Sequence, residues 1–242
     1  MSAYEPKYYR LWIKEKDLVS FNVVVKETDL FIQARRNLRK KALAVISKQR
    51  TLLEKYIERH PGFITALEPF PVGGDAPHIV KEMAAAAEKV GVGPMAAVAG
   101  AFAEFVGREL LNFSTEVIVE NGGDIFLKNL KQRLVGVYAG ENPFTGKIAL
   151  KIEPGETPLG ICTSSGMVGH SLSFGSADAA IVVSPSTPLA DAAATAIGNL
   201  VKTDDDVNRG IEFAQGVDGI RGIAVIKGDR LALWGQIEIV RR

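Results

Sequence analysis

Asp191 and Thr195 stand four residues apart in an alanine-rich stretch near the end of the chain, Ala-Asp-Ala-Ala-Ala-Thr-Ala. On a helix, residues at this spacing share one face. A carboxylate and a hydroxyl so placed could ligate a hard cation such as Mg²⁺, which takes few protein ligands and completes its shell with water and substrate phosphates. Structural roles are also open, because an acidic residue in a first helical turn stabilises the helix dipole and a helical threonine often bonds its own backbone.

A glycine pair follows the apolar run 117–119 and so falls at the end of an expected strand, in the order Asn121, Gly122, Gly123. Two adjacent glycines permit positive φ angles and leave backbone N–H groups uncovered for a ligand. An Asn-Gly pair is equally a strong signal for a hairpin turn. The sequence leaves both interpretations open.

The segment 160–166 reads Gly-Ile-Cys-Thr-Ser-Ser-Gly and is rich in hydroxyl groups. Hydroxyls and free N–H groups can cradle phosphate oxygens without net charge, which makes Thr163, Ser164, Ser165 and Gly166 candidate nucleotide-binding residues. The segment is not a P-loop, because no Gly-Lys-Ser/Thr ends it. A Ser-His-Asp hydrolase is poorly supported, since the chain has no G-x-S-x-G elbow. His170, one of three histidines, is a candidate for proton transfer or for a structural hydrogen bond.

Short β-branched and aromatic runs precede and follow stretches with helical spacing of apolar residues. Strands come first, then helices, then strands and helices together. This order favours an α+β fold, with an antiparallel or mixed sheet and packed helices, over a doubly wound parallel sheet. We expect one compact domain over 1–242, because no repeat or linker divides the chain. Strands are expected at 8–14, 19–26, 29–34, 116–120, 124–128, 133–138, 147–153, 159–163, 177–184, 222–227 and 231–240, and helices at 37–60, 77–90, 94–111, 189–201 and 206–215.

The amino-acid composition excludes some classes of protein. Lys and Arg number 29 against 28 Asp and Glu, and the net charge of +1 argues against a dedicated nucleic-acid-binding protein. The single cysteine, Cys162, excludes an internal disulfide framework and a cysteine-cluster zinc site. We expect no membrane span and no signal peptide, because no long uncharged apolar run occurs, and hence a cytoplasmic protein. Small-residue helices and glycine-rich edges leave a homo-oligomer open.

Six blocks of the sequence, in order, resemble the ApbE superfamily, and more closely an uncharacterised prokaryotic family within it. The best-known members of the superfamily are FAD:protein FMN transferases with an α+β fold. The blocks are VKETDL at 25–30, VGPMAAVAG at 92–100, VENGGDI at 119–125, GICTSSG at 160–166, GHSLSFG at 169–175 and ADAAATAIGN at 190–199. The resemblance therefore extends over nearly the whole chain.

The resemblance implies a ligand, a metal and a reaction. Members of the superfamily bind FAD, use Mg²⁺ at the pyrophosphate and transfer FMN to a threonine of a partner protein. Their metal ligands correspond here to Asp191, Thr195 and the backbone carbonyl of Ala96. Ala97 stands where the superfamily has a lysine, so a cation that would face phosphate is missing.

Two hypotheses follow. In the first, the chain is an enzyme that holds FAD, FMN or another diphosphate-containing nucleotide along Gly122-Gly123 and the 163–166 segment, with a cation at Asp191 and Thr195. Asp124 would orient the ligand or take a proton, and His170 would be a second acid or base. In the second, the chain is a non-catalytic accessory protein, or carries sulfur on Cys162. The closer family is associated with sulfide assimilation and homocysteine formation in anaerobic prokaryotes, which would supply a sulfur-pathway partner.

Overall fold

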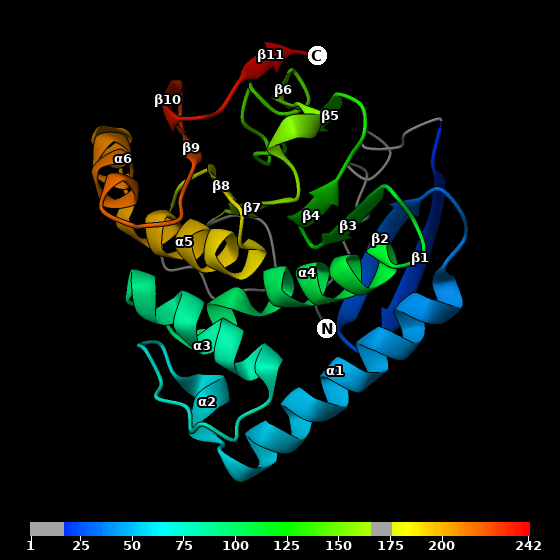
Figure 1. Ribbon diagram of the computed structural model, residues 1–242. Helices are drawn as coiled ribbons and strands as arrows, with labels where there is room; N and C mark the ends of the chain where they lie inside the picture. Colours follow the sequence, from blue (N-terminus) through cyan, green and yellow to red (C-terminus); the bar gives the residue numbers. More distant parts are fainter. Residues whose placement is uncertain (1–16, 166–175) are drawn as a thin grey trace.

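A computed structural model describes residues 17–165 and 176–242 of the chain. Its centre is an eight-stranded sheet in which all neighbouring strands run antiparallel (Figure 1). In the order of the sheet, the strands are β1 Val19–Val25, β2 Thr28–Ala34, β3 Val117–Asn121, β4 Asp124–Lys128, β7 Leu159–Ser164, β8 Ala179–Ser184, β9 Gly222–Lys227 and β10 Arg230–Gly235. The expected strand at 8–14, together with Gly166 and His170, lies outside the described residues.

Helices cover one face of this sheet (Figure 1). Two of them, α4 and α5, pack directly on the central strands, and α3 packs on the outside of this inner pair. Helix α1 contacts both α4 and the edge strand β1, and α6 contacts the β9–β10 edge. The helical elements are α1 Arg39–Arg59, α2 Gly62–Thr65, α3 His78–Val90, η2 Pro94–Ala97, α4 Val98–Leu111, η3 Pro154–Glu156, α5 Thr187–Leu200, η4 Asp204–Asp206 and α6 Val207–Gln215.

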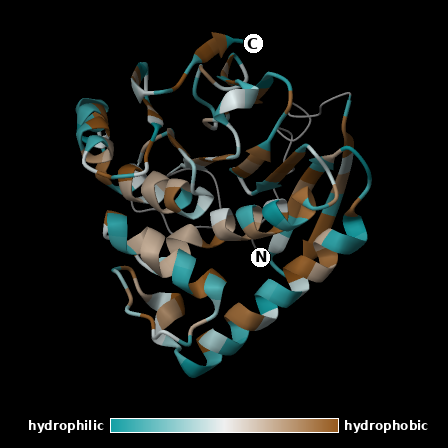
Figure 2. Cartoon of the chain, viewed as in Figure 1, coloured by the Kyte–Doolittle hydropathy of each residue, from teal (hydrophilic) through white to brown (hydrophobic). Residues whose placement is uncertain are grey.

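A smaller antiparallel sheet, in the order β11 Ile239–Arg241, β6 Ile148–Ile152 and β5 Arg133–Gly136, belongs to a second hydrophobic cluster. Side chains alternate between the faces of a strand, so the large sheet serves two cores. Val119 and Phe126 belong to the core shared with the helices, whereas Ile118 and Leu127 belong to the core shared with the small sheet. Figure 2 shows the hydrophobic residues gathered along the strands and along one side of α1.

The expected α+β class, with an antiparallel sheet and packed helices, is confirmed. One expected strand is wrong in extent, because the run 231–240 forms two strands rather than one. Gly235 has a φ of 82°, and a Cβ there would lie 2.2 Å from the carbonyl oxygen of Arg221. The chain leaves the large sheet at this glycine, and β11 then pairs with β6 in the small sheet.

A buried ion-pair network joins the two sheets near the start of the described chain. The guanidinium of Arg133, on β5, lies 3.0 Å from Glu116 and 2.8 Å from Asp17. Glu116 has no exposed side-chain surface and is also paired with Arg35. Hydrogen bonds from Arg133 and Lys131 hold the pKa of Asp17 below its usual range.

A helix that crosses a bilayer needs about 20 consecutive, mostly apolar residues. In the part of the chain that the structure describes, no single helix is long and apolar enough to cross a membrane. The segments His78–Val90 and Pro94–Leu111 meet that requirement only as a pair, which is bent by 107°.

Candidate functional site

The glycine pair forms the tight turn between β3 and β4. Asn121 pairs with Asp124 across the hairpin, and Gly122 and Gly123 have φ angles of 68° and 111°. The hairpin interpretation is therefore confirmed. The N–H of Gly123 donates to the Glu120 side chain at 2.9 Å, whereas a Cβ at Gly122 would meet nothing within 4 Å. The open side of the turn is thus at Gly122, and its role in nucleotide binding stays a prediction.

Asn121 joins this turn to the helix layer. Its side-chain amide donates to the carbonyl oxygen of Ala99, at 3.0 Å, in the first turn of α4. Asp124 begins β4 and is 7% exposed, and its Oδ1 is buried without a hydrogen-bond partner. A buried acceptor without a partner is costly, so this oxygen is a candidate for contact with a ligand.

Burial raises the pKa of Asp124 to about 7, and the Glu120 carboxylate adds to the rise. Hydrogen bonds from the Cys162 thiol and the Thr163 backbone act in the opposite direction. A carboxyl group with a pKa near neutrality can either hold or release a proton at physiological pH, which is the property that general acid–base chemistry requires.

The end of β7 lies beside Asp124. Cys162 is fully buried, and its Sγ lies 3.5 Å from the carbonyl oxygen of Thr187. Burial, with the nearby Asp124 and Asp191 carboxyls, raises the pKa of the Cys162 thiol well above its usual value. This thiol is therefore protonated and shielded from solvent, which is the opposite of the exposed, low-pKa environment of reactive cysteines.

The three hydroxyl residues that follow Cys162 do not share one face. Ser164 is two residues beyond Cys162 and so faces the helices, where its hydroxyl is buried without a partner. Thr163 alternates to the other face, although its backbone reaches Asp124. Ser165 is half-buried just beyond β7. Their part in binding a nucleotide stays a prediction, and Gly166 and His170 are outside the described chain.

Asp191 and Thr195 lie one turn apart on α5, and both are buried, at 9% and 7% exposure. Oδ2 of Asp191 accepts a hydrogen bond from the backbone N–H of Gly100 at 2.8 Å. Burial raises the pKa of Asp191 well above its usual value, and the Asp124 carboxyl raises it further, against hydrogen bonds from the backbone of Gly100 and Ala99. The Asp124 carboxyl therefore opposes the ionisation of Asp191.

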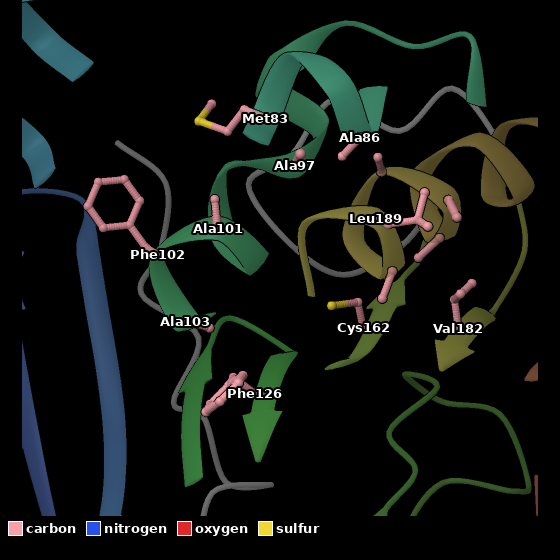
Figure 3. Close-up of a cluster of buried hydrophobic side chains, with 14 of the residues drawn as sticks. Met83, Ala86, Ala97, Ala101, Phe102, Ala103, Phe126, Cys162, Val182 and Leu189 are labelled. Atoms are coloured by element: carbon pink, nitrogen blue, oxygen red, sulfur yellow. The ribbon is translucent and has the colours of Figure 1, made fainter. Parts of the chain in front are cut away.

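Small residues allow α4 and α5 to approach the buried cluster formed by Asp124, Cys162 and Asp191. A Cβ at Gly100 would lie 2.5 Å from the carbonyl oxygen of Thr187 and 2.8 Å from Cβ of Asp191, and one at Gly160 would lie 2.5 Å from Cα of Thr187. Figure 3 shows Ala97, Ala101 and Cys162 among the side chains of this region. The sequence alone does not single out Gly100 or Gly160, because a glycine in a sequence does not show which neighbouring residue lies against it.

The donors in this cluster fit a hard divalent cation. In the described ranges, no lysine or arginine forms an ion pair with Asp124 or Asp191, and no three His, Cys, Asp or Glu side chains are placed to hold a metal. A cation here would rely on the Asp191 carboxylate, the Thr195 hydroxyl and the half-buried Ala96, which offers a carbonyl. Mg²⁺ typically binds few protein oxygens, and water and phosphate complete its coordination shell.

A separate cavity of about 620 Å³ opens between α1, α3 and α4. The described residues that line it include Lys48, His78, Glu104 and Arg108, but none of the predicted nucleotide or metal residues. The buried cluster and this cavity are thus different features of the molecule. The cavity reaches α5 at Pro188, and Glu104, which also lines it, accepts a hydrogen bond from Thr187.

This fold, with helices on one face of an antiparallel sheet, is shared with solved structures of ApbE flavin transferases. The flavin transferase ApbE from Vibrio cholerae superposes with a TM-score of 0.56 at 15% identity, over 93% of this chain and 96% of the other. The apo form of the flavinyl transferase ApbE from Pseudomonas stutzeri gives a TM-score of 0.54 at 12% identity, over 90% and 93%. At these identities the likeness establishes the fold.

Sequence comparison gives the closer relationship. The chain belongs to the family described as AbpE bacteria, which matches residues 10–216. A UPF0280 protein of Methanococcus vannielii is 44% identical over 93% of this chain and 94% of its own length. A UPF0280 protein of Methanocaldococcus jannaschii is 41% identical over 96% and 94%. The resemblance inferred from the six sequence blocks is confirmed.

Proposed function

We propose that this protein binds a flavin, or another nucleotide containing a diphosphate, together with a divalent cation, and that it cleaves the nucleotide or transfers its FMN part. The observation that carries the proposal is the buried, unneutralised pair Asp124 and Asp191, which lies beside Thr195 within an ApbE fold. Two buried carboxyl groups, each with a raised pKa, form a site that a cation stabilises.

The cation would be held by the chain's own oxygen atoms. Oδ2 of Asp191 already accepts a hydrogen bond from Gly100, and Oδ1 would ligate the metal. The Thr195 hydroxyl, one turn further along α5, and the Ala96 carbonyl would complete the protein's share. Mg²⁺ bound there would neutralise negative charge on the pyrophosphate. This role matters here because Ala97 offers no cationic side chain.

The nucleotide would lie across the end of the sheet. The open side of Gly122, the Asn121 side chain and the Thr163–Gly166 segment would contact it. Asp124 would use its unpartnered Oδ1 to orient the ligand or to take a proton from the attacking group. The attacking group would be water, which gives FMN and AMP from FAD, or a threonine hydroxyl of an acceptor protein, which gives a flavinylated protein and AMP.

The alternative, a non-catalytic accessory protein, is favoured by one observation, the alanine at position 97. A sulfur-carrying role for Cys162 is disfavoured, because its thiol is fully buried and its pKa is raised. An accessory protein would bind a nucleotide without turning it over. Mass spectrometry after treatment with polysulfide, which supplies the sulfane sulfur and leaves as a polysulfide shorter by one sulfur atom, tests the sulfur-carrying role directly, and a persulfide at Cys162 would support it.

Thermal-shift measurements with FAD, FMN and ATP, with and without Mg²⁺, test binding, because a ligand held only by the folded state raises apparent stability. Chromatography of FAD after incubation with the protein and Mg²⁺ then tests for FMN and AMP. Asp191→Asn retains an acceptor for Gly100 but removes the charge, and we expect it to abolish turnover. Asp218→Asn, at an exposed aspartate, is the control. Undiminished turnover in Asp191→Asn contradicts the metal assignment.

A further inference from the structure

Two backbone N–H groups at the contact between α4 and α5 are each bound by a carboxylate of the other helix. Gly100, in the first turn of α4, donates to Oδ2 of Asp191 at 2.8 Å. Thr187, which begins α5, donates to Oε2 of Glu104 at 2.6 Å. The first turn of a helix has N–H groups without intrahelical partners, so each carboxylate caps the neighbouring helix.

The two contacts fix one register. Gly100 and Glu104 are one turn apart on α4, and Thr187 and Asp191 are one turn apart on α5, in the opposite order. The helices are therefore antiparallel here, and a slide of either helix would break both bonds. Gly100 has no room for a side chain against Thr187 and Asp191, so the helices have already reached closest approach.

Glu104 is held in place for this contact. Its side chain is 12% exposed, and its other oxygen, Oε1, accepts from Nε of Arg108 at 2.6 Å. Ser186, the residue before α5, caps its first turn by accepting from the backbone N–H of Leu189 at 3.3 Å, and this bond does not involve the Thr187 N–H. Thr187 thus depends on Glu104 for its hydrogen bond, and a charged acceptor makes that bond stronger than a neutral one would.

We infer that Glu104 is a positioning residue for the Asp191 site: it fixes α5 against α4, so that Asp191 keeps one carboxylate oxygen on Gly100 and presents the other to the cation. The inference rests on the proposed function. Glu104 itself would not touch the cation, because its two oxygens are occupied by Thr187 and Arg108. It caps the helix that carries both predicted side-chain ligands, Asp191 and Thr195.

The test measures binding of Mn²⁺, supplied as MnCl₂, from the loss of the electron paramagnetic resonance signal of the free ion. Glu104→Ala removes the acceptor, and we expect Mn²⁺ affinity to fall about tenfold or more, the size of one charge-assisted hydrogen bond. Glu104→Gln keeps an acceptor for Thr187, and we expect affinity within about threefold of the wild type. Glu109→Ala, at an exposed glutamate of the same helix, is the matched control.

A second readout separates positioning from folding. Hydrogen exchange of the Gly100 amide, followed by NMR without metal and well below the unfolding temperature, should become faster in Glu104→Ala and stay slow in Glu104→Gln. If Glu104→Ala binds Mn²⁺ as tightly as the wild type, the inference is wrong while the metal site stands. If the wild-type protein leaves the Mn²⁺ signal unchanged, the metal assignment itself is overturned, and the inference fails with it.

Discussion

The hydrogen bond of 2.8 Å between the Gly100 backbone and Oδ2 of Asp191 makes the predicted metal ligand part of the helix packing. Asp191 caps the first turn of α4, and in the proposed function its second oxygen would also ligate the cation. The requirement for close contact is met by glycine, because a Cβ at Gly100 would lie 2.8 Å from Cβ of Asp191. The geometry of the site and the stability of the fold therefore depend on the same atoms.

Gly100→Ala should destabilise the protein by about 1–3 kcal/mol, the usual cost of overpacking. This cost must also exceed the gain of up to about 1 kcal/mol that alanine brings to a helix. Gly74→Ala, where a Cβ meets nothing within 4 Å, is the control and should leave stability almost unchanged. Urea denaturation measures both variants. A Gly100→Ala protein as stable as the wild type would show that the helices can separate without cost.

Thr195→Val tests the hydroxyl on the same helix. Valine has nearly the shape of threonine but cannot ligate a cation, so we expect Mn²⁺ affinity to fall about tenfold, consistent with the loss of one ligand bond. Thr195→Ser restores the hydroxyl and should bind within about threefold of the wild type. Titration with MnCl₂, followed by electron paramagnetic resonance of the free ion, measures the Mn²⁺ affinity of each variant. Equal affinity in Thr195→Val would mean that the hydroxyl serves only the helix backbone.

Asp124→Asn should change how stability depends on pH. Because the folded-state pKa is raised to about 7, the folded protein keeps a proton that the unfolded chain loses near pH 4. The free energy of unfolding of the metal-free wild type should therefore fall as pH rises from about 4 to 7, by on the order of 2–4 kcal/mol. In Asp124→Asn this fall should be smaller, although Asp191 contributes in the same direction.

Denaturation at pH 4, 6 and 8 measures this dependence. At pH 8, metal-free Asp124→Asn should be more stable than the wild type, while its turnover of FAD should be lost. Asp218→Asn, at an exposed position, should follow the wild-type curve. Parallel curves for Asp124→Asn and the wild type would mean that this carboxyl group is not the one that titrates.

Local features of the sequence could predict most elements, since alternation of apolar residues, Pro-Gly breaks and glycine turns act over a few residues. The hairpin at Gly122-Gly123 is an example, because the turn geometry itself demands residues that adopt positive φ. The break at Gly235 was missed, since residues that favour strands stand on both sides of it and only pairing with β6 separates the two strands.

The site could be predicted only in part. Asp191 and Thr195 were recognisable because their spacing is helical, but the contact of Asp191 with Gly100 joins residues 91 positions apart. Glu104 was missed for the same reason. It stands one turn before Arg108 and reads as half of an exposed i,i+4 pair, whereas its second oxygen binds Thr187. Such contacts are set by helix packing, which no local pattern encodes.

The buried network around Glu116 should carry more stability than the exposed pairs beside it. Arg133 is 4% exposed and bonds to Glu116, which has no exposed side-chain surface. Removing one partner of a buried pair leaves a charge without compensation, so Arg133→Met should cost about 3–5 kcal/mol. Lys131→Met is the matched control, because Lys131 also pairs with Asp17 but is 61% exposed, and exposed pairs contribute about 1 kcal/mol or less. Urea denaturation at pH 7 compares the two. Equal losses would mean that Arg35 alone neutralises Glu116 and that the contact with Arg133 adds little.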